Sequence, residues 1–165
     1  MRKYEHFLVL IAELDNDASE ILRLVSQNTR AWERILNGAK DPIDWGALGF
    51  TIQRLYGLFE NYCLRISKFF ENNLPKERWH KALLEKMTLD IPGLRPALFT
   101  KKEYFSEANE LLKFRHRLRN LYGEDLDEDK TTEIQTISEN FFLKVFPAVH
   151  SEFRSKILAI AEALR

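Results

Sequence analysis

The chain has little of what stabilises small secreted domains, and nothing in it resembles a membrane span. Among its 165 residues there is one cysteine, Cys63, within an apolar helical pattern. A lone cysteine excludes a disulfide framework and is typical of a core residue in a reducing compartment. No apolar run approaches the roughly 20 residues of a transmembrane helix, and the N-terminus lacks a signal-peptide pattern. We therefore expect a soluble, cytoplasmic protein that does not bind a membrane.

An excess of charge of either sign is also missing. The chain has 25 lysines and arginines and 25 aspartates and glutamates, so its formal net charge is zero. This balance neither favours nor excludes nucleic acid, because a local patch can bind where the average charge does not. The length and the 45% apolar composition suit a single globular domain over residues 1–165.

The sequence has helical periodicity from end to end and no strand pattern. Apolar residues recur at steps of three and four over two long segments, interrupted in the first by the polar Asn28. Asn37-Gly38 ends the first segment, and Asp41-Pro42 supplies an N-cap and a first-turn proline for the second. The two helices are predicted to pair antiparallel. Their apolar residues are Phe7, Ile11, Leu14, Ala18, Ile21, Val25, Trp32 and Ile35, then Leu48, Ile52, Leu55, Phe59, Tyr62, Ile66 and Phe69.

Shorter helices are predicted in the middle of the chain. One runs from Lys76 to about Thr88, and the prolines and glycine of residues 90–99 exclude a regular helix after it. Thr100 and Glu103 have the spacing of a capping box and are predicted to open the next helix.

The C-terminal part is predicted to be helical from residue 134 to residue 164, and Pro147 should kink or divide it. The acidic run before it, GEDLDED, lacks the spacing of a calcium loop. Asp127 as an N-cap, with Glu128 and Asp129 in the first turn, explains most of this acidity, so no metal and no other cofactor is predicted. The fold class expected is all-α, an antiparallel helical bundle with long N- and C-terminal helices.

Chemically capable side chains are concentrated in one stretch, residues 111–127, which reads LLKFRHRLRNLYGEDLD. On a helix, its leucines and phenylalanine share one face, and polar residues follow beside that face. Tyr122 comes seven residues after Arg115 and would place a phenol at the end of an arginine-lined strip, before Gly123 caps the helix. The polar residues beside the apolar face are Arg115, His116, Arg119 and Asn120.

Within this stretch, the seven residues 113–119 include four cations, namely Lys113, Arg115, Arg117 and Arg119. Like charges at four-residue spacing repel by roughly a few tenths of a kcal/mol per pair, so helix stability alone would not select them. An anionic partner would, which makes phosphate or RNA binding one interpretation. An ordinary solvated surface and a protein interface are the alternatives.

The run from Arg115 to Tyr122, RHRLRNLY, resembles the motif of HEPN-domain proteins of the HepT type. In that motif an Arg is followed directly by a polar residue, and four positions separate the Arg from a His-x-Tyr run. The resemblance covers roughly Leu48 to Asp127, about half of the chain. The other segments that carry it are Trp79-His80, Leu83-Leu84, Met87, the run from Asp90 to Pro96, and the run from Gly123 to Asp127.

The resemblance implies an all-α bundle that forms a homodimer, with two copies of the motif in one cleft. It implies a metal-independent RNase, commonly the toxin of a toxin-antitoxin system, encoded with a minimal nucleotidyltransferase antitoxin that adds AMP to the motif tyrosine. By position, Arg115 would hold the scissile phosphate, His116 would be the polar residue beside it, and Tyr122 would be modified. The neighbouring cations expected to bind RNA are Lys113, Arg117 and Arg119.

The sequence departs from the motif at Asn120, where the family has its catalytic histidine. An amide can be neither a general acid nor a general base. His116 lies one turn earlier and is placed to shuttle protons instead, with Arg115 and Arg119 stabilising the charge on the phosphorane. Alternatively, Asn120 makes the domain catalytically silent, and it binds RNA or a nucleotidyltransferase partner. A third interpretation is a helical interaction protein that dimerises through its first two helices.

Two residues outside the motif also have candidate roles. His80 has no Cys, His or carboxylate at metal spacing, and we interpret it as a structural histidine that caps a neighbouring helix or bonds to the proline-rich loop, with a catalytic part as the alternative. Arg95, between Pro92 and Pro96, is interpreted as the anchor of that loop through an ion pair, with a position in the cleft as the alternative.

Overall fold

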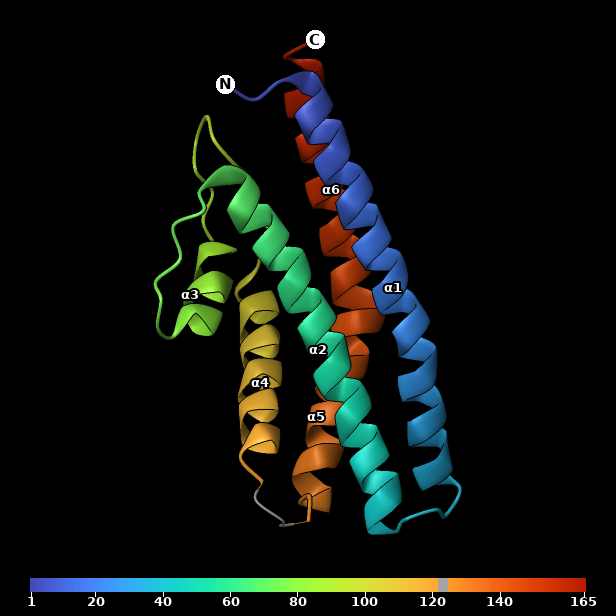
Figure 1. The fold of residues 1–165 in the computed structure, drawn as a ribbon. Helices are drawn as coiled ribbons and strands as arrows, with labels where there is room; N and C mark the ends of the chain where they lie inside the picture. The colour runs from blue at the N-terminus through green and yellow to red at the C-terminus, as the bar shows by residue number, and fades with distance from the viewer. Residues whose placement is uncertain (122–124) are drawn as a thin grey trace.

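The computed structural model of the chain describes residues 1–121 and 125–165. Its two longest helices form an antiparallel pair, in which α1 covers Tyr4–Leu36 and α2 covers Pro42–Phe70 (Figure 1). The turn between them is the one predicted. Asn37 is the C-cap of α1, Gly38 has a positive φ of 105°, and the Asp41 side chain caps the first turn of α2.

The remaining helices pack around this pair (Figure 1). They are α3 (Trp79–Lys86), α4 (Lys102–Arg119), α5 (Glu128–Asn140), the π-helical turn η1 (Phe141–Val145) and α6 (Phe146–Glu162). The first three of them contact α2, and α6 runs beside α1, so the two ends of the chain lie together. The predicted all-α antiparallel bundle with long N- and C-terminal helices is confirmed. None of the helices in the described residues is long and apolar enough to cross a membrane.

Two helix starts differ from the prediction. The N-cap of α4 is Lys101, which makes no side-chain capping hydrogen bond, so the capping box predicted at Thr100 and Glu103 is wrong. The third helix begins later than the predicted Lys76. Its N-cap, Arg78, has a left-handed φ of 54°, a conformation that a regular right-handed helix cannot include.

Pro147 divides the C-terminal helical segment, as predicted, and the π-helical turn η1 lies directly before α6. Proline has no N–H to donate to the preceding turn, and a π turn is one way in which a helix accommodates that loss. Phe141 and Phe142, which are consecutive in this turn, are both buried.

The interior of the bundle is strongly aromatic around Phe59 of α2. The centre of its ring lies 5.0 Å from that of Phe141 and 5.7 Å from that of Phe146, both edge to face. Cys63 is buried beside this cluster, and burial raises the pKa of its thiol well above the usual value. It is therefore the core residue that the sequence predicted.

Asn28, the polar residue that interrupts the apolar pattern of α1, is buried and forms hydrogen bonds to two other helices. Its amide nitrogen lies 2.9 Å from Oε1 of Gln135 on α5 and 3.0 Å from Oγ1 of Thr51 on α2. The Gln135 amide nitrogen in turn donates to Oδ1 of Asn28 at 2.9 Å. Because buried amides are costly when unpaired, this reciprocal pair fixes the register of α1 against α5.

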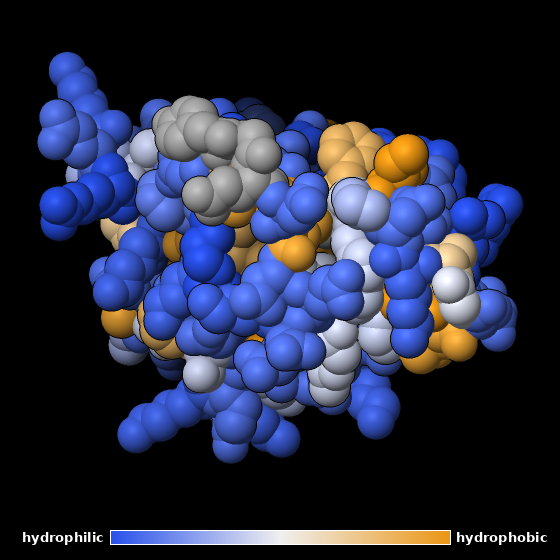
Figure 2. Space-filling view, turned by 90° about the horizontal axis from the view of Figure 1, so that it is seen from below, coloured by the Kyte–Doolittle hydropathy of each residue, from blue (hydrophilic) through white to orange (hydrophobic). Residues whose placement is uncertain are grey.

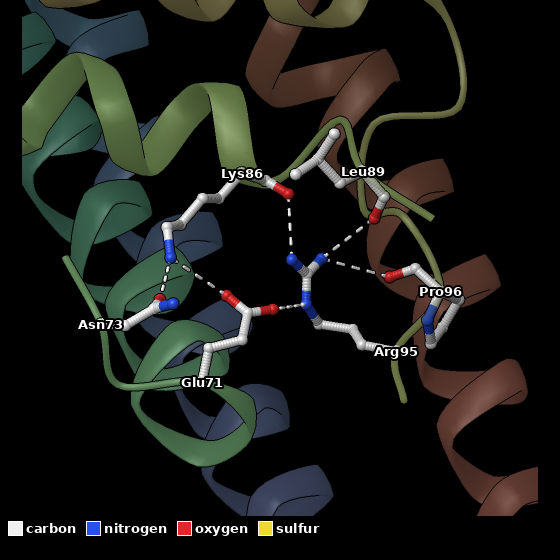
Figure 3. A network of polar contacts seen from close by, with 6 residues as sticks. All are labelled: Glu71, Asn73, Lys86, Leu89, Arg95 and Pro96. Atoms are coloured by element: carbon white, nitrogen blue, oxygen red, sulfur yellow. Dashed lines mark hydrogen bonds and ion pairs between the residues drawn. The ribbon is translucent and has the colours of Figure 1, made fainter. Parts of the chain in front are cut away.

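Arg95 anchors the loop between α3 and α4, as predicted (Figure 3). Its side chain is fully buried, and Nε donates to Oε1 of Glu71 at 2.7 Å. The two terminal nitrogens donate to the carbonyl oxygens of Lys86 at 3.0 Å, Leu89 at 3.3 Å and Pro96 at 3.4 Å. The guanidinium thus ties the end of α3 to the loop that follows it, and the alternative position of Arg95 in a functional cleft is wrong.

Replacing Arg95 should therefore destabilise the protein strongly. We expect Arg95→Ala to lower the free energy of unfolding by about 3 to 5 kcal/mol, because several carbonyls lose their donor and the Glu71 carboxylate keeps only the longer ion pair of 3.6 Å with Lys86 among the described residues. Arg95→Lys should lose most of the same stability, because one ammonium group cannot serve all four acceptors. The measurement is urea unfolding, with Arg23→Ala as control. Arg23 pairs with Glu20 on the exposed surface, so its loss should cost less than about 1 kcal/mol.

A second polar network joins α6 to α1 and α2 through His150. The Tyr62 hydroxyl lies 2.8 Å from Nδ1 of His150, and Nε2 of His150 lies 3.0 Å from Oδ1 of Asp15, which also binds Arg154 at 2.9 Å. Burial raises the pKa of Tyr62, so its phenol stays protonated and donates a hydrogen bond to Nδ1. Burial lowers the pKa of His150 below its usual value, although Asp15 opposes this effect. Burial thus favours the neutral imidazole.

The stability of the protein should depend on pH through His150. Because its pKa is lower in the folded than in the unfolded chain, the neutral form contributes stability that is complete above the unfolded value of 6.5 and is lost as the pH falls below it. We expect the urea midpoint to fall less steeply with decreasing pH in His150→Gln than in the wild type. The exposed His6 provides the control variant His6→Gln, which should retain the slope of the wild type. Equal slopes in all three proteins would contradict this role of His150.

Candidate functional site

Arg115 is the predicted site residue that turns toward the interior of the bundle. Its side chain is 16% exposed, and Nη1 donates to Oε1 of Glu60 on α2 at 2.8 Å. The guanidinium carbon lies 5.8 Å from the centre of the buried Tyr56 ring. Leu111 and Phe114 of the same helix are buried, so Arg115 occupies the border of the apolar face that the periodicity predicted.

Arg115 keeps hydrogen-bonding capacity for a further partner. A guanidinium carries five N–H donors. The contact with Glu60 is the one hydrogen bond that the described residues give it. Nε is buried without an acceptor among them, so the donors left for a ligand are those of the terminal nitrogens. A guanidinium that is fixed by one carboxylate and has donors left over is suited to bind a phosphate group.

Glu60 is a site residue that the sequence reasoning missed. Its carboxylate is 5% exposed, and Oε2 lies 2.8 Å from Nδ1 of His80 in the first turn of α3. One buried carboxylate therefore joins α2, α3 and α4. The sequence did contain a signal, because Tyr56 and Cys63 lie four residues before and three residues after Glu60. A carboxylate between two apolar residues on one helix face predicts a buried charge that needs a partner.

The position of His80 corrects its interpretation from sequence. Its partner is the Glu60 side chain, and neither a helix end nor the proline-rich loop. The imidazole stacks on Trp79 with 3.8 Å between ring centres and an interplanar angle of 27°. Its side chain is 34% exposed, so it is held from one side and open to solvent on another. His80 thus shares a carboxylate with Arg115 and belongs to the candidate site.

His116 and Asn120 lie at the exposed end of α4 and contact each other. The Asn120 amide nitrogen is 3.3 Å from Nε2 and 2.9 Å from the backbone oxygen of His116. The helix ends at Arg119 with Asn120 as its C-cap, so the predicted end at Gly123 is wrong. Tyr122 and Gly123 lie outside the described residues, and the prediction of a tyrosine above Arg115 remains a prediction.

The other three predicted cations of α4, Lys113, Arg117 and Arg119, are exposed. Lys113 makes a surface ion pair of 3.1 Å with Glu110. Arg117 and Lys130 line a hollow of about 420 Å³ between the end of α4 and the start of α5. Figure 2 views the molecule from this end, and most of the surface seen there is hydrophilic, with apolar patches between. The cations are therefore accessible to a large anionic ligand.

An all-α bundle with an inward arginine near the end of its fourth helix has the architecture implied by the HEPN resemblance. A comparison with family models gives the same assignment. Residues 47–157 match the model described as HepT-like protein. Because the match spans more than half of the chain, the protein belongs to the HepT-like family of HEPN proteins. The match also extends beyond the expected limit at Asp127, through α5 and η1 into α6. No curated protein and no solved structure matches the chain.

Proposed function

We propose that the protein is a metal-independent endoribonuclease of the HepT type, in which Arg115 binds the scissile phosphate. The observation that carries this proposal is the setting of Arg115, which Glu60 fixes at 2.8 Å and which has donors to spare in the described part of the chain. During cleavage, negative charge builds up on the phosphorane oxygens. A guanidinium already held in place stabilises that charge without reorganising at the moment of reaction.

The exposed cations of α4 would supply affinity for RNA. Lys113, Arg117 and Arg119 lie on the solvent side of the helix that carries Arg115. Contacts of this kind are made to phosphates, so they strengthen binding without selecting a sequence. Asn120 has no titrating group, so proton transfer would fall to a histidine. His116 is the candidate on α4 itself.

The active form would be a homodimer in which two copies of α4 line one cleft. The side chains of His116, Arg119 and Asn120 are exposed, which leaves this end of α4 open to a second copy.

Light scattering should then give about twice the protomer mass of 19.5 kDa, whereas a protomer mass at assay concentration would exclude a composite cleft. Crosslinking through the first two helices instead would favour the helical interaction protein.

The partner would be a minimal nucleotidyltransferase that silences the toxin by adding AMP to Tyr122. Membership of the HepT-like family and the position of Tyr122, seven residues after Arg115, support this pairing. A bulky anionic group this close in sequence to the cations of α4 would compete with RNA for them.

A catalytically silent module that binds RNA or this partner is the second candidate. It is favoured by the contact of 3.3 Å between the Asn120 amide nitrogen and Nε2 of His116. A donor amide at this distance occupies the lone pair that a general base on His116 would need.

The ribonuclease proposal predicts RNA cleavage in the presence of EDTA that requires Arg115. We expect purified protein to cleave an end-labelled RNA pool, and Arg115→Ala to reduce the rate by at least about 100-fold because the phosphorane loses its main cation. Arg115→Lys should recover only part of the activity, since an ammonium cannot bind Glu60 and a phosphate in the same geometry.

Arg23→Ala is the matched control for this assay, because Arg23 is an exposed arginine of α1 paired only with its helical neighbour Glu20 among the described residues. It should cleave at the rate of the wild type. Binding of RNA without cleavage by the wild type would support the silent module, and cleavage that Arg115→Ala leaves intact would exclude the proposed role of Arg115.

The pairing with a nucleotidyltransferase predicts a specific modification. We expect a minimal nucleotidyltransferase encoded beside this protein to add one AMP to it from ATP, which intact-mass spectrometry would detect. Tyr122→Phe should abolish the mass increase. Tyr104, a half-buried tyrosine at the start of α4 that is still present in this variant, should not be modified in its place. An unchanged mass increase in Tyr122→Phe would place the modification elsewhere.

A further inference from the structure

His80 has the geometry of a histidine held for proton transfer. Its Nδ1 lies 2.8 Å from a carboxylate oxygen of Glu60, and its ring is stacked on Trp79. The carboxylate accepts a hydrogen bond, so in the neutral imidazole the proton is on Nδ1 and the lone pair is on Nε2. No described residue bonds to Nε2, and the side chain is 34% exposed. A ligand can therefore reach the basic nitrogen of His80.

The same carboxylate fixes the distance between His80 and Arg115. Oε1 of Glu60 binds Nη1 of Arg115 and Oε2 binds Nδ1 of His80, each at 2.8 Å. Arg115 and the imidazole of His80 are thus bonded to the two oxygens of one buried carboxylate. His116, by comparison, is exposed, and its Nε2 lies against the Asn120 amide.

The surroundings of His80 are suited to an RNA strand. Lys76, Arg78 and Lys81 are exposed and flank His80 in the sequence, and they outnumber the one exposed anion among them, Glu77. The cations of α4, which packs against α3, add to this positive charge. Glu60 neutralises part of the charge of Arg115, so these additional cations are needed to attract a polyanion.

We propose that His80, oriented by Glu60, is the general base of the RNA cleavage reaction and takes the role that Asn120 cannot fill. This role rests on the proposed ribonuclease function. Nε2 of His80 removes the proton from a 2′-hydroxyl, and the 2′-oxygen forms a bond to the phosphorus held by Arg115. The bond from phosphorus to the 5′-oxygen breaks, and the leaving oxygen takes a proton from water. The products are a 2′,3′-cyclic phosphate and a 5′-hydroxyl, and His80 then returns its proton to the solvent.

The decisive variant is His80→Asn, because the Asn amide can still donate to Glu60 in place of Nδ1 but cannot accept a proton. We expect cleavage in EDTA to fall by about 100-fold or more, the usual contribution of a general base, with RNA affinity and the thermal midpoint nearly unchanged. The wild-type rate should depend on pH through the protonation of the general base, and His80→Asn should lose this dependence. Added imidazole should restore part of the activity of His80→Ala. His6→Asn, at the exposed start of α1, is the control.

The possible outcomes separate this proposal from the one on which it rests. Wild-type activity that depends on Arg115 but is unchanged in His80→Asn would overturn the role of His80 alone, and loss of activity in His116→Asn would then assign the base to α4. A wild-type protein that does not cleave RNA would overturn both proposals. A reduced rate in His80→Asn with an unaltered pH profile and no rescue by imidazole would assign His80 a structural role and also overturn the proposal.

Discussion

The candidate site depends on one buried charge, the carboxylate of Glu60 on α2. Removing a carboxylate from water costs several kcal/mol unless it is paired. Glu60 meets this cost with two partners on different helices, Arg115 of α4 and His80 of α3, each at 2.8 Å. Because neither partner is close to Glu60 in sequence, the pairing forms only when the three helices are packed. The interaction that offsets the buried charge therefore also brings together Arg115 and His80, the two groups of the proposed site.

A second carboxylate, that of Glu71, acts at the other end of the same segment; Glu71 is the C-cap of α2, and its side chain is 9% exposed. Glu71 follows Glu60 by eleven residues, about three helical turns, so the two point to similar sides of α2. Glu60 holds His80 at the start of α3, and Glu71 holds Arg95 in the loop after it. The short helix α3 is therefore fixed at both ends by α2. Such pairing gives His80 a defined position although α3 itself has only eight residues.

The fold was predictable from sequence where local chemistry determines it, and less so where the packing of distant segments does. Apolar periodicity and the caps at Asp41 and Asp127 gave the long helices and their order. The capping box at Thr100 failed because its spacing is a local signal that the packed chain does not use. His80 was assigned the wrong partner for the same reason, since Glu60 lies twenty residues away and its burial depends on α3 and α4 covering a second face of α2.

The same contrast explains why a motif histidine at position 120 need not be the residue that does the chemistry. A general base is effective when its ring is held in one orientation and its free nitrogen faces the substrate. Position 120 is the C-cap of α4, exposed, with its nearest described partner one turn back on the same helix. Position 80 is tied to the centre of the bundle through a carboxylate that also holds Arg115, the arginine proposed to bind phosphate. A site arranged around Glu60 can therefore lose the histidine at position 120 and keep a proton acceptor beside Arg115.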